Sequence, residues 1–162
     1  MIKTTIQKRN YDTDKIKEGK VRVGWWADVK YEDGVSVAQV ARWNEFGTPY
    51  IPKRPFFRPV VHGQRTELVQ ELRKLYTDAL IDNKNTLNAL KVFGEDVIGR
   101  VKVSIQQVTT PANAPITIHG GWLRRKGHKA VYIEGKGFNK PLYDSGLMLN
   151  SVSYEVEEVK AK

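Results

Sequence analysis

The sequence predicts an α+β domain: an antiparallel sheet with three main helices packed on one of its faces. Apolar and polar residues alternate near both ends of the chain, at residues 21–25 and 152–156, as in half-buried strands. Between these ends, apolar residues recur at helical spacing in three stretches. Strands at the ends with helices grouped between them favour helices segregated to one face of an antiparallel sheet.

The predicted strands have one apolar and one polar side each. Val21 and Val23 face one way with Trp25, and Val152 begins a similar alternation near the C-terminus. We expect these two strands to pair in one sheet. Residues 2–6 carry a weaker strand pattern, and residues 15–18 are compatible with a short helix.

Composition limits the class of protein. A length of 162 residues indicates one domain, spanning residues 1–162, and 40% of the residues are hydrophobic. No apolar run approaches the ~20 residues of a membrane helix, and the N-terminus lacks a signal-peptide core. We therefore expect a soluble protein made in the cytoplasm, with no membrane partner.

Several chemistries are disfavoured. The chain has no cysteine, which excludes disulfides, thiolate metal sites and cysteine nucleophiles. Its three histidines have no second ligand at metal-binding spacing, and no nucleophile, phosphate-loop or metalloprotease motif is present. Glu45 ends an aromatic-rich helix and is more simply a solvated side chain than a general base. We expect no catalytic residues, no cofactor and no metal, and hence not an enzyme.

The first helical stretch leads into a proline-rich segment. Ser36 can cap a helix that ends before Gly47, where a positive φ is needed. Residues 48–57 then predict a stiff, non-helical crossing, because each proline fixes φ and keeps its predecessor extended. The prolines of this region are Pro49, Pro52, Pro55 and Pro59.

Two phenylalanines end this crossing and need burial, either in this chain or in a neighbour. Phe56 and Phe57, with Phe46, are expected first in the domain's own core. Arg54 and Arg58 flank them and can pair with carboxylates of an adjacent subunit. A rigid crossing suits an edge that meets a copy of itself around a ring, where contacts are head-to-tail and close by rotation.

Two longer helices follow. Residues 61–81 form one amphipathic pattern, and residues 87–108 form another, which would extend ~30 Å. Asp96 and Arg100 can pair on the wet side of the second. Gly94 and Gly99 are each costly inside a helix, by roughly 1 kcal/mol against alanine. These two glycines could permit a close helix crossing or a bend, or the helix could simply tolerate two weak positions, and the sequence favours neither explanation.

The segment 117–140 is rich in glycine and lysine and predicts an extended basic loop or hairpin, with a strand near residues 130–134. Its cations lie close to two aromatic residues, Trp122 and Tyr132, a combination that single-stranded nucleic acids can stack on. Of three possible roles for this segment, we rank docking on an acidic protein surface first, a solvated hairpin tip without a partner second, and direct contact with DNA third. The net charge of +9 suits a polyanionic partner or simple solubility equally.

Two separated blocks of sequence carry a family resemblance. The first covers residues 38–48 (AQVARWNEFGT) and 51–60 (IPKRPFFRPV), and the second covers 113–116 (NAPI) and 140–152 (KPLYDSGLMLNSV). In this order they resemble the tailed-phage family of tail-completion and head–tail joining proteins, of the minor tail protein Z type. Leu147 departs from the family pattern, which often has a cation near this position.

The resemblance implies the same α+β fold and a structural role in the virion neck. There the chain would complete the tail and join it to the head connector as a ring, a hexamer matching the tail, with DNA passing through the bore. Implied partners are further copies, a tail terminator or tail tube protein, and head connector or adaptor proteins. The alternative is a small basic nucleic-acid-binding module. The residues expected at interfaces are Trp43, Phe46, Arg54, Phe56, Phe57, Arg58, Trp122, Arg124, Arg125, Lys126 and Lys129.

Overall fold

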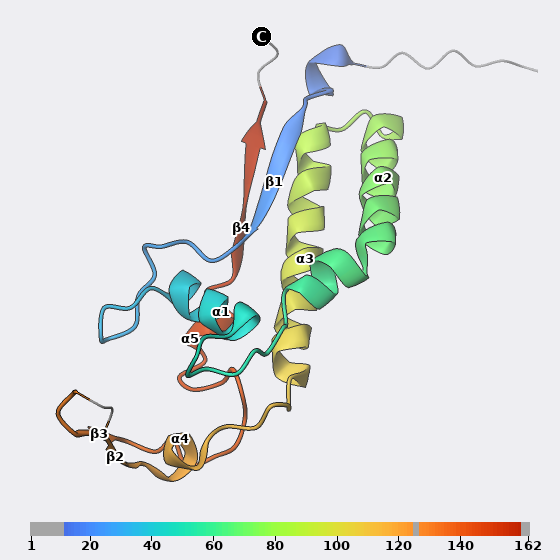
Figure 1. The fold of residues 1–162 in the computed structure, drawn as a ribbon. Helices are drawn as coiled ribbons and strands as arrows, with labels where there is room; N and C mark the ends of the chain where they lie inside the picture. Colours follow the sequence, from blue (N-terminus) through green and yellow to red (C-terminus); the bar gives the residue numbers. More distant parts are fainter. Residues whose placement is uncertain (1–11, 125–126, 160–162) are drawn as a thin grey trace, which may run out of the picture.

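The computed structural model describes residues 12–124 and 127–159 and confirms the α+β class (Figure 1). The molecule is elongated. A two-stranded sheet and the long helices α2 and α3 form one end, while α1, α4, α5 and a small hairpin form the other (Figure 1). The predicted strand at residues 2–6 lies outside the described residues. In place of the expected helix at residues 15–18, a 3₁₀ turn spans Thr13–Lys15.

The strands at the two ends of the chain pair as predicted. β1 (Gly19–Gly24) runs antiparallel to β4 (Ser153–Glu158), with Val21 opposite Val156 and Val23 opposite Tyr154. These apolar side chains face α3, which packs against both strands. The opposite face of the sheet is charged and exposed, and it carries Lys20, Arg22, Glu155 and Glu157.

Helix α3 (Thr86–Gln107) is the longest element and the centre of the fold. The side chain of Asn85 caps it by accepting the Leu87 N–H at 2.9 Å. The structure distinguishes its two glycines. A Cβ on Gly94 would lie 2.7 Å from the Tyr154 ring, so this glycine permits close packing of helix on sheet, whereas a Cβ on Gly99 would meet nothing within 4 Å.

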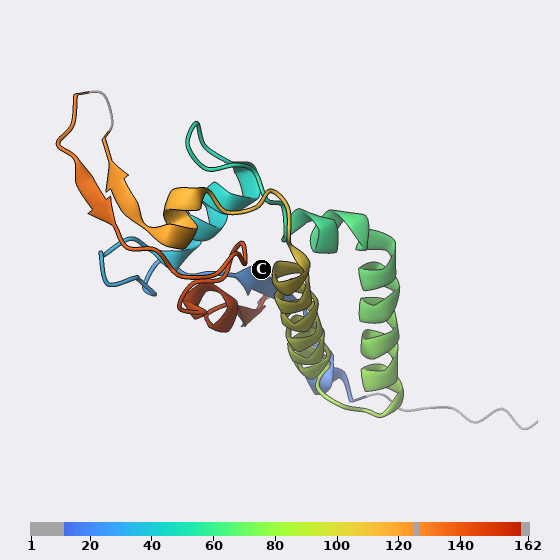
Figure 2. The same ribbon diagram turned by 90° about the horizontal axis from the view of Figure 1, so that it is seen from below.

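Helix α2 (Arg65–Ile81) packs on the side of α3 that faces away from the sheet (Figures 1 and 2). A short π-helical turn, Pro59–Gly63, leads into it. Arg100 of α3 binds Asp96 of its own helix at 2.5 Å, as predicted, and also carboxylates of α2. These are Glu67 at 2.7 Å and Glu71 at 2.6 Å. The predicted pair therefore belongs to a network that joins two helices, not to a solvated surface.

Helix α1 (Val37–Phe46) begins and ends as its sequence predicts. Ser36 Oγ accepts the Gln39 N–H at 3.2 Å, and Gly47 follows the last turn at φ 77°. Residues 48–57 then cross without helix or strand. The hydrophobic core lies where α1, the end of this crossing, α3 and the segment around α5 meet, and its least exposed side chains include Val37, Phe56, Val101 and Ile105.

The basic segment forms a hairpin at the end of the molecule farthest from α2 (Figures 1 and 2). It follows the short helix α4 (Pro115–His119) and consists of β2 (Gly121–Leu123) and β3 (Val131–Ile133), paired antiparallel. The chain then returns to α5 (Leu147–Asn150). Gly146 precedes this helix, and Ser145 Oγ accepts the Leu147 N–H at 3.3 Å.

Candidate interaction surfaces

Glu45 fixes the end of the proline-rich crossing. Its carboxylate accepts the backbone N–H groups of Phe56 at 2.7 Å, Phe57 at 2.9 Å and Arg58 at 3.2 Å. It also binds the Arg58 guanidinium at 2.8 Å. The residue is 4% exposed, so the expectation of a solvated Glu45 is wrong. Three consecutive N–H groups that no helix or strand can satisfy need an acceptor, and this carboxylate supplies it.

The electrostatics of Glu45 follow from these contacts. Burial alone raises the pKa of this carboxyl, but the backbone N–H groups and the Arg58 guanidinium outweigh burial. The net pKa of Glu45 therefore lies below the ordinary value of a glutamate, and the side chain is charged at neutral pH.

Two residues expected at interfaces are used inside the chain instead. Phe56 has no exposed surface and contacts Trp25 edge to face, with ring centroids 5.6 Å apart. Arg54 is 6% exposed and donates to the carbonyl oxygens of Pro111 at 2.7 Å and Ala112 at 2.9 Å. The first expectation for Phe56, a place in the core, is confirmed, and backbone acceptors within the chain bind the Arg54 guanidinium. Burial also lowers the pKa of Arg54.

Phe46 has the opposite fate. It is 58% exposed at the end of α1, so its expected place in the core is wrong and its place on an interaction surface stays a prediction. The Arg58 guanidinium lies 4.8 Å from the centre of its ring. The carboxylate that pairs with Arg58 belongs to Glu45 of the same chain, and not to an adjacent subunit as the sequence suggested. Trp43 and Phe57 are half-buried.

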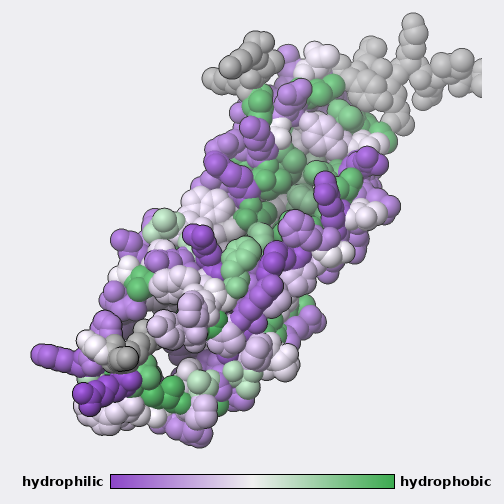
Figure 3. Space-filling view, in the orientation of Figure 1, coloured by the Kyte–Doolittle hydropathy of each residue, from purple (hydrophilic) through white to green (hydrophobic). Residues whose placement is uncertain are grey.

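An apolar pocket of about 240 Å³ opens beside Phe46. Trp25, Ala38, Ala41 and Phe57 contribute to its lining, and it reaches Val23 and Gly24 at the end of β1. A second apolar groove, of about 230 Å³, lies along α2 and includes Leu68, Leu72 and Phe93. In Figure 3 the hydrophobic surface on this face gathers mainly over the upper half of the molecule, between β1 and α2.

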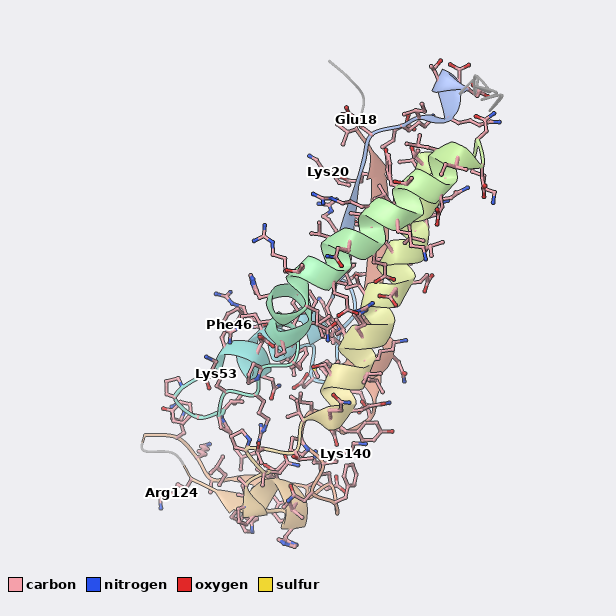
Figure 4. The ribbon with its side chains drawn as sticks, turned by 90° about the vertical axis from the view of Figure 1, so that its right-hand side faces the viewer. Glu18, Lys20, Phe46, Lys53, Arg124 and Lys140 are labelled. Atoms are coloured by element: carbon pink, nitrogen blue, oxygen red, sulfur yellow. The ribbon has the colours of Figure 1, made fainter. Side chains whose placement is uncertain are left out.

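The hairpin presents aromatic side chains to solvent. Trp122 and Tyr132 are cross-strand partners, 73% and 58% exposed, with ring centroids 5.5 Å apart. Arg124 directly follows β2 and is exposed, and Lys129 is exposed in the loop between the strands. Figure 4 shows Arg124 at the far end of the molecule from Glu18. Arg125 and Lys126 lie outside the described residues.

The two blocks of the family resemblance meet around a pocket of about 410 Å³ that has both polar and apolar lining residues. Asn44 and Arg54 reach it from the first block, and Asn113, Asp144 and Ser145 reach it from the second. Lys136, between them, donates to the carbonyl oxygens of Lys140 and Tyr143, and its burial lowers its pKa. The pocket thus marks the place where α1, α4 and the loop before α5 meet.

Sequence reasoning missed Glu45 and Lys136 as organising residues. The signal for Glu45 was present, because the segment after Arg54 has three N–H donors in a row and no regular structure to pair them. Lys136 gave no such signal, since its acceptors are carbonyl groups placed by the fold of a later loop.

Two general findings apply to the described residues. No helix among residues 12–124 and 127–159 is both long and apolar enough to cross a bilayer. Within the same ranges, no three histidine, aspartate or glutamate side chains gather where they would hold a metal ion.

The chain matches no model of a known protein family, no curated protein and no solved structure.

Proposed function

We propose that this chain is a structural protein of a tailed-phage neck, which completes the tail and joins it to the head connector as a ring of identical copies. One observation supports this most. The two sequence blocks that resemble the tail-completion family, more than fifty residues apart, line one pocket, and Arg54 of the first block binds the carbonyl groups of Pro111 and Ala112, immediately before the second. Residues that recur together in a family and also meet in space are those a common fold needs.

The geometry suits a mechanical role. Glu45, Arg54 and Lys136 hold the crossing and the returning loop with bonds to backbone atoms, so the frame between α1 and the hairpin is stiff. This frame presents two exposed aromatic surfaces, Phe46 with its pocket and the Trp122–Tyr132 pair. Exposed aromatic residues of this kind form the centres of protein interfaces. Head connector and tail proteins, with copies of the chain itself, are the proposed partners, and the virion neck is the proposed location.

Genetic complementation tests this function. In a phage that lacks the gene, the wild-type chain should restore joined particles, whereas Trp122→Ala and Phe46→Ala should leave separate heads and tails. Lys74→Ala, an exposed change on α2 far from both surfaces, is the control and should restore joining. Normal joining in the absence of the gene would contradict the proposal.

A second function is favoured by the hairpin itself. Trp122 and Tyr132 expose stackable rings beside Arg124 and Lys129, which is the arrangement single-stranded nucleic acids bind. Titration of the purified protein with single-stranded DNA, followed by tryptophan fluorescence, tests it. Salt-sensitive quenching that Trp122→Phe removes would support a nucleic-acid-binding module, and no binding at low salt would contradict it.

A further inference from the structure

Within residues 12–124 and 127–159, the sheet formed by β1 and β4 has both edges unpaired. It contains two strands only, and no other described strand pairs with either edge. The Val159 N–H donates to Glu18 O at 2.9 Å, which fixes the alternation of the ladder. Residues 18, 20 and 22 thus bond to β4, so Gly19, Val21 and Val23 direct their N–H and C=O groups outward. On β4 the outward groups belong to Tyr154, Val156 and Glu158.

These edges lack most of the devices that prevent strand addition. Each strand has six residues, without proline, and their one-to-one register leaves no bulge. Isolated pairs of strands are marginal, and open edges are usually blunted by proline, bulges or a covering element. Both edges carry charged side chains, and the signs of these charges determine which edges can pair with each other.

The two edges carry opposite charge on the solvent face of the sheet. β1 contributes Lys20 and Arg22, and β4 contributes Glu155 and Glu157, all exposed. Figure 4 shows Lys20 pointing away from the helices. Two β1 edges would set cations against cations, and two β4 edges would set carboxylates against carboxylates, which destabilises cross-strand pairs. Only unlike edges are complementary.

We propose that β1 of one copy pairs with β4 of the next, so that a single antiparallel sheet runs from copy to copy. The pairing would bond the outward groups of Gly19, Val21 and Val23 to those of Tyr154, Val156 and Glu158 of a second copy. Apolar side chains would then continue along the inner face, and alternating charges along the outer face. This head-to-tail contact generates a ring when its rotation closes. The inference rests on the proposed function, because it specifies the contact between copies of the ring.

Site-directed cross-linking tests this pairing, and the absence of native cysteine makes the test clean. Lys20→Cys and Glu157→Cys are prepared as separate proteins, each exposed at its new thiol. A bismaleimide linker of about 8 Å reaches directly opposite and diagonal positions across paired strands. Covalent dimers should form at least tenfold faster in the equimolar mixture than in either protein alone. Dimers of Lys20→Cys alone, or of Glu157→Cys alone, would overturn the proposal because they require like edges to meet.

A backbone variant gives a second readout. Glu158→Pro removes an N–H that points outward, so no bond of the sheet within the chain is lost, while an incoming strand loses a donor. Glu158→Ala is the control, because it removes the same side-chain contact with Lys17 and keeps the N–H. Added to the Glu157→Cys protein, the proline should reduce cross-linking to Lys20→Cys severalfold and the alanine should not. Equal cross-linking with both would overturn the proposal.

Native mass spectrometry of the wild-type protein separates this inference from the proposed function. A ring without cross-links in the mixture overturns the strand pairing and leaves the ring in place. A protein that neither cross-links nor forms a ring, even with its partner proteins present, contradicts both.

Discussion

Glu45 shows how one residue can position a whole segment. A carboxylate at the end of α1 gathers the N–H groups of Phe56, Phe57 and Arg58, and thereby sets where the crossing enters the core. The side chain is buried and charged, so its removal leaves several donors without an acceptor. Charge-assisted hydrogen bonds of this type are about twice as strong as neutral ones.

Replacing Glu45 with glutamine should lower the free energy of unfolding by about 3 kcal/mol, because an amide offers one acceptor oxygen and sets its NH₂ group against backbone donors. Urea unfolding of the purified protein measures this. The exposed Glu32→Gln is the matched control and should change stability by less than about 0.5 kcal/mol. Equal stability of both variants would contradict the role of Glu45.

The same residue predicts a pH dependence. The pKa of Glu45 is lower in the folded protein than in the unfolded chain, so the unfolded state binds more protons at acidic pH. Its stabilising contribution is complete above the unfolded value of 4.5 and is lost as the pH falls through the folded value. Urea midpoints measured between about pH 7 and pH 3 should fall more steeply for the wild type than for Glu45→Gln. Parallel pH profiles would contradict this prediction.

Two glycines on one helix allow a paired substitution. Gly94→Ala forces a Cβ to within 2.7 Å of the Tyr154 ring and should destabilise the protein by about 1–3 kcal/mol. Gly99→Ala meets nothing within 4 Å and should stabilise it by about 0.5–1 kcal/mol, because alanine has less backbone freedom to lose. Thermal unfolding measures both, and a shift of the same sign in the two variants would contradict the packing described here.

At the scale of elements, periodic sequence was sufficient for much of the fold. The long helices, the Ser36 cap of α1 and the pairing of β1 with β4 were predicted, because apolar spacing and the Ser36 side chain act locally, whereas the Asn85 cap of α3 was not predicted. The sequence did not predict which side of α2 faces α3, since that depends on carboxylates that converge on Arg100. Apolar spacing likewise could not separate Phe46 from Phe56, because both have the size of core residues.

The two phenylalanines give a prediction about α1 and the crossing. Phe56→Ala should cost about 3–5 kcal/mol of unfolding free energy, because the ring is fully buried against Trp25 and its loss leaves a cavity. Phe46→Ala should leave stability nearly unchanged, since its ring is 58% exposed. Chemical denaturation of both variants measures this, and similar losses in the two would place Phe46 in the core after all.

At the scale of the whole molecule, the candidate surfaces lie on different parts of an elongated body. The edges of the sheet and the groove along α2 belong to one end, the hairpin to the other, and Phe46 lies between them (Figures 1 and 4). Residue types alone indicated the aromatic and basic surface of the hairpin. The proposal that copies pair through the sheet edges, in contrast, requires the register of β1 and β4, which the sequence does not supply.

The central claim is that copies of this chain form a passive ring at the junction of head and tail. Cryo-electron microscopy of virions, with and without the gene product, tests it most directly. We predict a closed, symmetric collar at the neck that is built from copies of this fold, with β1 of each copy beside β4 of the next. Particles with normally joined tails and no such chain at the neck would contradict the claim.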